Sequence, residues 1–219
     1  MIHIDFLIED VSGNVMLENL LPKIIASDQA SYTIRYYKGI GRIPAKMTSA
    51  KTIKNRQLLE QLPRLLNGFG KTYKGRGPTF HGHVIVICDL DNNPLSDFKA
   101  QMEEVLQNCY VQPAASFCFA IEEGEAWLLG DREAIKKAYP HANISILETY
   151  HQDAICGTWE KLADVVGFKR INKNYQEIGM AKRQWAEMIT PYMNIERNQS
   201  PSFQYFVATI QNILSGQSL

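Results

Sequence analysis

The chain has 219 residues, of which 45% are hydrophobic and 21% charged, and its formal net charge is zero. This composition is typical of a globular protein with a buried core, and it excludes a disordered chain and a simple polycation. No apolar run approaches the roughly 20 residues of a membrane-spanning helix, and the N-terminus lacks the basic start and apolar stretch of a signal peptide. The four cysteines have no paired spacing, so we expect reduced thiols and a cytoplasmic location.

Charge is unevenly distributed along the sequence. Residues 35–76 contain eleven Lys or Arg and one acid, Glu60, which gives +10. Residues 85–160 contain four basic and thirteen acidic residues, which gives −9. A basic segment beside an acidic one is typical of a phosphate-contacting surface next to a metal cluster. Two solvated faces that partly neutralise each other would give the same pattern.

The first part of the chain alternates between strand and helix patterns. Residues 2–8 are apolar and β-branched, which predicts a buried strand, and Ser12 can cap the helix that follows. The next segments predict, in order, a strand, a basic loop, a helix and a Gly-rich surface loop (32–37, 42–53, 54–67 and 68–82). His81-Gly82-His83 falls at the end of this loop and forms no complete metal site.

The clearest buried strand is His83–Cys88, followed by a helix from Pro94 to about Asn108 and a fourth strand at 116–121. Helical patterns then continue to the C-terminus (123–130, 132–138, 158–166, 180–192 and 202–214). Strands and helices that alternate at this spacing predict an α/β fold with a mainly parallel four-stranded sheet and helices on both faces. We expect residues 1–150 to form this domain and residues 151–219 to form an α-helical C-terminal extension packed on it.

Acidic residues follow three of the four predicted strands. Glu9 follows the first, Asp89 and Asp91 follow the third, and the acids of segment 122–125 follow the fourth. Ligands of open parallel sheets bind beyond the carboxyl ends of the strands, where the winding direction changes. Acids gathered at that edge repel one another unless a cation holds them, and hard oxygen ligands suit Mg²⁺ or Mn²⁺. The sequence therefore predicts a divalent-metal site.

Each of these acids also has a plainer interpretation. On an extended segment Asp89 and Asp91 would point the same way, toward one ion, but Asp-x-Asp after a strand is also a common turn or helix-capping device. Glu123 and Glu125 could complete a second ion position, or they could be acids at a helix start favoured by the helix dipole.

Glutamate after the first strand with Asp-x-Asp after the third resembles the TOPRIM fold of primases, topoisomerases and overcoming-lysogenization-defect nucleases. More narrowly, the chain resembles, over nearly its full length, the TOPRIM-like domain of unknown function 4276 family. The matching segments are 6–10, 38–40 with Pro44, 89–91, 123–127, 138–140, 157–160, 181–182 and 197–203.

The resemblance implies that Glu9, Asp89 and Asp91 hold Mg²⁺ or Mn²⁺, with Glu123 and Glu125 at a second ion position. It also implies a catalytic role for Glu9 and for Lys182, which would neutralise charge developing on the phosphate. A solvated lysine on a helix face is the alternative for Lys182.

The function implied is a metal-dependent phosphodiesterase or endonuclease, or a nuclease-like subunit, acting on nucleic acid. The DNA backbone would run along residues 35–76, and an ABC-type ATPase would be the partner protein.

A non-catalytic TOPRIM-like module that binds a partner protein or nucleic acid is the competing hypothesis. Many TOPRIM domains have Gly after the first-strand glutamate, where this chain has Asp10. A side chain there either prevents close approach of the backbone to a phosphate or adds an acidic ligand. Segment 38–42 lacks the Walker spacing of a nucleotide-binding loop. Trp127 is expected in the core, and Ser200-Pro201 is expected to start a helix.

Overall fold

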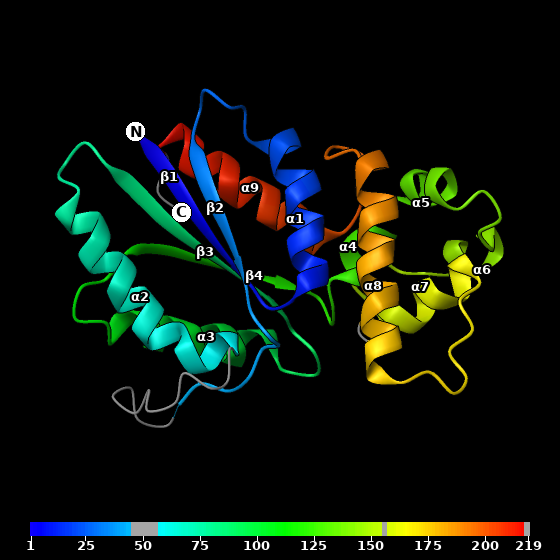
Figure 1. The fold of residues 1–219 in the computed structure, drawn as a ribbon. Coiled ribbons are helices and arrows are strands. Elements are labelled where there is room, and N and C mark those ends of the chain that lie inside the picture. The colour runs from blue at the N-terminus through cyan, green and yellow to red at the C-terminus, as the bar shows by residue number, and fades with distance from the viewer. Residues whose placement is uncertain (45–56, 155–156, 217–219) are drawn as a thin grey trace.

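The computed structural model describes residues 1–44, 57–154 and 157–216. Its centre is an all-parallel sheet of four strands in the order β2-β1-β3-β4 (Figure 1). The strands are β1 (Ile2–Ile8), β2 (Ser31–Tyr36), β3 (His81–Asp89) and β4 (Ala114–Ala120). The chain runs from β1 outward to β2 and then crosses back over β1 to reach β3, so the winding direction reverses between β1 and β3. The predicted α/β fold with a parallel four-stranded sheet is confirmed.

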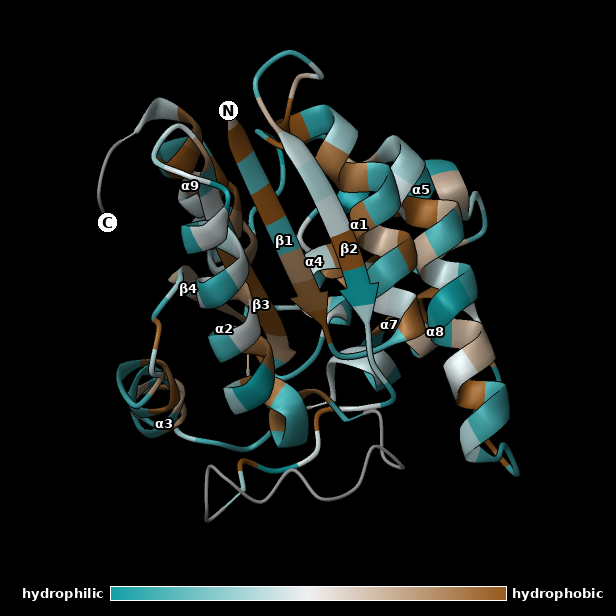
Figure 2. Cartoon of the chain, turned by 60° about the vertical axis from the view of Figure 1, so that its left-hand side comes forward, coloured by the Kyte–Doolittle hydropathy of each residue, from teal (hydrophilic) through white to brown (hydrophobic). Residues whose placement is uncertain are grey.

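Helices cover both faces of the sheet. Side chains of β1 alternate between the faces, so that Ile4 and Phe6 pack in one core with α1 (Val11–Ile24) and α9 (Pro201–Ser215). Leu7 packs in a second core with α2 (Leu58–Gly75) and α3 (Leu95–Gln107). Figure 2 shows hydrophobic residues along β3 and at the arrowhead of β1, as expected for strands that are buried on both faces.

The remaining helices form a lobe beside α1, beyond the carboxyl ends of the strands (Figure 1). They are α4 (Glu125–Leu129), α5 (Arg132–Ala138), α6 (Ile144–Glu148), α7 (Thr158–Val166), α8 (Tyr175–Ile189) and the 3₁₀ helix η1 (Thr190–Tyr192). Helix α8 packs along α1, and α9 then returns the chain to the sheet beside β4. The helices predicted toward the C-terminus are present as α7, α8 and α9, and the packing of α8 on α1 brings α8 next to the end of β1.

Hydrogen bonds of Trp127, Arg197 and the start of α9 hold this lobe together. Asp131 is fully buried and accepts hydrogen bonds from Arg197 Nη2 at 2.7 Å and from the Asn194 backbone N–H at 2.8 Å. Trp127 lies in the core, as predicted, and its indole N–H donates to Ser202 Oγ at 3.0 Å. The predicted start of α9 is also confirmed, because Ser200 caps the helix and Pro201 is its first residue. Arg197 and the start of α9 therefore have a structural role.

Several local predictions were wrong. Ser12 does not cap α1; Asp10 does, because its Oδ1 accepts from the Gly13 N–H at 2.8 Å while Ser12 Oγ donates to its Oδ2 at 2.7 Å. Strand β3 begins at His81, two residues before the predicted strand His83–Cys88, so His81 lies in the strand rather than in the predicted loop. Helix α6 was not predicted.

The predicted loop at 68–82 begins too early, because α2 continues to Gly75. Phe69 and Tyr73 extend the face of the helix that packs on the second core. Gly70 lies against the backbone oxygen of Val111, where a larger residue would not fit. The predicted basic loop at 42–53 and the predicted start of the helix at residue 54 lie largely outside the described residues. Within the described ranges, no helix is both long enough and apolar enough to cross a membrane.

Candidate functional site

Glu9 and Asp89 lie together at the point where the sheet changes its winding direction. Strands β1 and β3 are neighbours, with Ile8 opposite Ile87, so the acids at the ends of these strands come close in space. Glu9 Oε2 accepts a hydrogen bond from the backbone N–H of Asp89 at 3.3 Å. Helix α1 leaves this point on one face of the sheet and α3 on the other, which is the arrangement that opens a crevice at a switch point.

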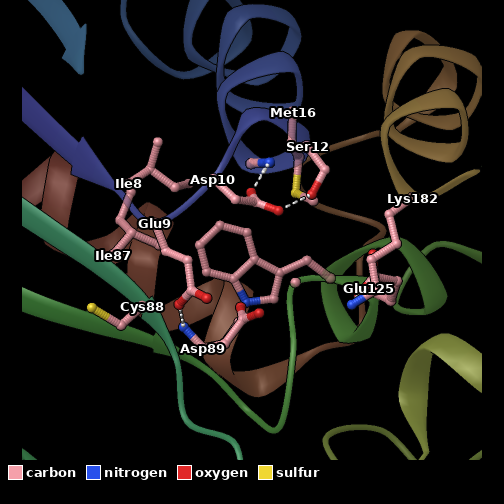
Figure 3. Close-up of a pocket in the computed structure, with 14 residues that line it drawn as sticks. Ile8, Glu9, Asp10, Ser12, Met16, Ile87, Cys88, Asp89, Glu125 and Lys182 are labelled. Carbon is pink, nitrogen blue, oxygen red and sulfur yellow. Dashed lines mark hydrogen bonds and ion pairs between the residues drawn. The ribbon is translucent and has the colours of Figure 1, made fainter. Parts of the chain in front are cut away.

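A small pocket occupies this crevice (Figure 3). It holds about 30 Å³ of free space, and a cavity needs roughly 10 to 15 Å³ to admit a water molecule, so one ion or one to two waters can enter. Its polar walls come from three parts of the chain far apart in the sequence: Glu9, Asp10 and Ser12 after β1, Asp89 at the end of β3, and Glu125 and Lys182 from the lobe.

Lys182 enters the site from α8. Its Nζ lies 2.9 Å from Glu123 Oε1 and 3.2 Å from Glu125 Oε2, and its side chain is only 16% exposed. The alternative of a solvated lysine on a helix face is therefore wrong. Burial by itself lowers the pKa of Lys182, but the carboxylates of Glu125, Glu123 and Asp89 outweigh it, so the pKa is raised and the ammonium stays charged.

Burial and neighbouring negative charges raise the pKa values of the acids around the pocket. Burial raises the pKa of Glu9 to about 7, and the neighbouring charge of Asp10 adds to this rise. Burial and the charge of Glu9 raise the pKa of Asp89 well above its ordinary value. Burial also raises the pKa of Glu125, although Lys182 acts in the opposite direction. If all three acids were ionised, the pocket would carry more negative charge than one ammonium neutralises, and a bound cation would offset that excess.

Asp91 differs from Asp89. Its backbone has a positive φ of 48°, so the assumption of an extended segment from Asp89 to Asp91 is wrong. Leu90 between them is buried, whereas Asp91 is exposed. The N–H of Asp91 donates to the backbone oxygen of Glu122 at 2.8 Å. Asp91 does not line the pocket, but its charge contributes to the raised pKa of Glu9.

The contacts of two residues next to the site, Glu122 and Thr158, were not predicted from the sequence. The carboxylate of Glu122 accepts hydrogen bonds from the backbone N–H groups of Gly157, at 2.6 Å, and Thr158, at 2.7 Å, and so binds the N-terminus of α7. Thr158 is fully buried, and its hydroxyl donates to Glu123 Oε2 at 3.4 Å. The only sequence signal for these contacts was the matching segment 157–160, whose Gly157 has a positive φ of 68°. They hold the segment of Glu123 and Glu125 against the lobe.

The donor set suits a hard cation that keeps part of its hydration shell. Mg²⁺ is commonly bound in proteins by one or two carboxylates together with water and phosphate oxygens, and Glu9 and Asp89 supply two carboxylates. In the part of the chain that the structure describes, no group of three or more His, Cys, Asp or Glu side chains has metal-binding geometry. Glu9 and Asp89 could therefore hold such an ion only together with water or phosphate oxygens.

The basic segment begins beside the site. After β2, the N–H of Gly39 donates to the backbone oxygen of Glu9 at 3.0 Å, which places exposed Lys38 near the pocket. Arg35 binds buried Asp5 at 3.2 Å and lies over the ring of Phe69. Arg35, Tyr37, Arg64, Phe69 and Thr72 line an open groove between β2 and α2. Four of the eleven basic residues (Lys46, Lys51, Lys54 and Arg56) lie outside the described residues.

Comparison with known proteins places the chain in a family. No curated protein and no solved structure matches it. A family model described as "Domain of unknown function (DUF4276)" matches residues 8–211, a range that contains every residue of the site. The chain therefore belongs to the DUF4276 family.

Proposed function

We propose that the chain binds Mg²⁺ or Mn²⁺ through Glu9 and Asp89 and acts on the phosphodiester backbone of nucleic acid, as a TOPRIM-like nuclease or nuclease-like subunit. The observation that carries this proposal is the convergence of the two acids in one pocket at the switch point, with raised pKa values and a buried lysine beside them. Asp91 lies outside the pocket and acts on it through its charge, which contributes to the raised pKa of Glu9.

The resemblance to TOPRIM agrees with this arrangement. It requires that the glutamate after the first strand and the aspartate after the third meet at neighbouring strand ends, and β1 and β3 are neighbours. A divalent ion, when bound, supplies a Lewis acid and a water of lowered pKa. Lys182 offers an ammonium to phosphate oxygens. Glu9 has a pKa of about 7 without a metal, and it would hold the ion as the charged carboxylate, because a divalent cation favours the ionised form.

The proposal includes a path for the nucleic-acid backbone from Lys38 along the groove between β2 and α2. The groove is lined by Arg35 and Arg64, and Lys71 lies further along the same helix. Within the described residues, Arg64 and Lys71 make no ion pair that would neutralise them. Arg35 already neutralises Asp5, so Arg64 is the stronger candidate for a phosphate contact. An ABC-type ATPase as partner rests on the resemblance alone.

Replacing Arg64 with Ala is expected to weaken binding to a labelled DNA duplex several-fold and to lower the slope of log affinity against log salt by about 1, because one phosphate contact is lost. Fluorescence anisotropy at four salt concentrations measures both quantities. Lys136→Ala is the matched control, since Lys136 is exposed on α5 and pairs with Glu133. An unchanged salt slope for Arg64→Ala would remove this groove from the path.

Incubation of the purified protein with supercoiled plasmid tests the function. We expect nicked circles in the presence of Mn²⁺ or Mg²⁺ and none in EDTA. A chain that binds Mn²⁺ and DNA without nicking at any pH between 6 and 9 would be the non-catalytic binding module. The capping role of Asp10 is the observation that favours this second function, because its side chain stands where many TOPRIM domains have Gly.

A further inference from the structure

We infer that the ammonium of Lys182 occupies the place of a second metal ion, so that the site takes one divalent cation rather than two. The inference rests on the proposed function and deepens it, because it assigns Glu123 and Glu125 to Lys182 and leaves Glu9 and Asp89 for the metal.

Glu123 and Glu125 are already engaged. Lys182 Nζ lies 2.9 Å from Glu123 Oε1 and 3.2 Å from Glu125 Oε2. The second oxygen of Glu123 accepts from the hydroxyl of Thr158 at 3.4 Å. The side chains of Lys182, Glu123 and Glu125 are 16%, 18% and 4% exposed, so these contacts are made largely out of water. Breaking them would leave buried carboxylates without a partner, which is costly.

Glu9 and Asp89 are differently placed. They come from the ends of β1 and β3, and no lysine or arginine of the described residues pairs with either. In Figure 3 they lie on one side of the pocket, with Lys182 and Glu125 on the other. A divalent ion at Glu9 and Asp89 therefore meets carboxylates that make no ion pair, whereas a second ion at Glu123 and Glu125 would meet a fixed positive charge.

The Lys182→Met variant separates the two possibilities, because methionine has nearly the length of lysine without its charge. Calorimetric titration with Mn²⁺ alone, with no nucleic acid, is expected to give one bound ion for the wild type and two for Lys182→Met. Lys182→Arg, which keeps the charge, is expected to bind one. The double variant Lys182→Met with Glu125→Gln is expected to return to one, since one acid is removed with the lysine. Lys136→Met is the control for loss of an exposed lysine.

The outcomes are distinguishable. Two ions bound by the wild type, or one ion bound by a folded Lys182→Met, would overturn the inference and leave the metal site standing. No ion bound by the wild type at millimolar Mn²⁺ would overturn the proposed function and the inference with it. If Lys182→Met does not fold, the stoichiometries of the wild type and of Lys182→Arg still decide, because two ions in either would contradict the role of Lys182.

Discussion

Asp89→Asn is expected to lower the rate of metal-dependent plasmid nicking by at least about 100-fold. Loss of a residue that merely orients a metal ligand commonly costs about 10- to 100-fold in metal affinity or activity, and loss of the ligand itself should cost no less. Asparagine keeps the size of the side chain, and the backbone N–H of residue 89 can still donate its hydrogen bond to Glu9. The effect therefore reports on the charge of the carboxylate at the end of β3 rather than on the packing around it.

Initial nicking rates over a range of Mn²⁺ concentrations measure this effect. If Asp89 binds the ion, saturating Mn²⁺ should restore part of the lost rate. Asp97→Asn is the matched control: Asp97 is an exposed acid in the first turn of α3, and the variant should nick like the wild type. Equal rates for Asp89→Asn and the wild type would show that Asp89 is no part of the proposed nuclease site.

Glu9→Gln is expected to become more stable relative to the wild type as pH rises. The folded protein raises the pKa of Glu9 from 4.5 to about 7, mainly by burial. Between these values the folded state binds more protons than the unfolded state, so the wild type loses stability as pH increases, and the loss is complete above pH 7. Glutamine cannot ionise and avoids this loss. The relative gain between pH 5 and pH 8 is roughly 2 to 3 kcal/mol.

The difference between the variant and the wild type is the quantity to measure. Burial lowers the pKa of His83 to about 4, so in the folded protein His83 resists protonation, and stability rises with pH between 4 and 6.5. This effect opposes that of Glu9 in the wild type and cancels in the difference. Urea unfolding at pH 5 and pH 8 in EDTA gives both free energies. Glu103→Gln, which replaces an exposed acid on α3, serves as control. If the difference in stability between Glu9→Gln and the wild type did not change with pH, the pKa of Glu9 would not be raised by folding.

The sequence by itself determined the parallel α/β fold and the two acids at the centre of the site. Apolar runs mark the strands, helical periodicity marks the helices between them, and both patterns depend on residues close along the chain. Glu9 and Asp89 follow directly after buried strands, so their place at the carboxyl edge follows from the direction of the strands. The start of α9 could also be predicted from neighbouring residues, because the capping Ser200 and the first-turn Pro201 are adjacent in the sequence.

Only the tertiary structure decided how that edge is completed. The packing of α8 on α1 brings Lys182 to Glu123 and Glu125, and the N-terminus of α7 binds Glu122. Asp91 has a left-handed backbone, and its N–H donates to the backbone oxygen of Glu122 in the loop after β4. Helix α2 continues past residue 67, where Phe69 and Tyr73 pack on the second core. These contacts join segments far apart in the sequence, and the residue spacing within one segment does not indicate which other segment it will contact. Residue types and local spacing thus identified the acids, whereas the counter-charges and caps that set their chemistry came from long-range packing.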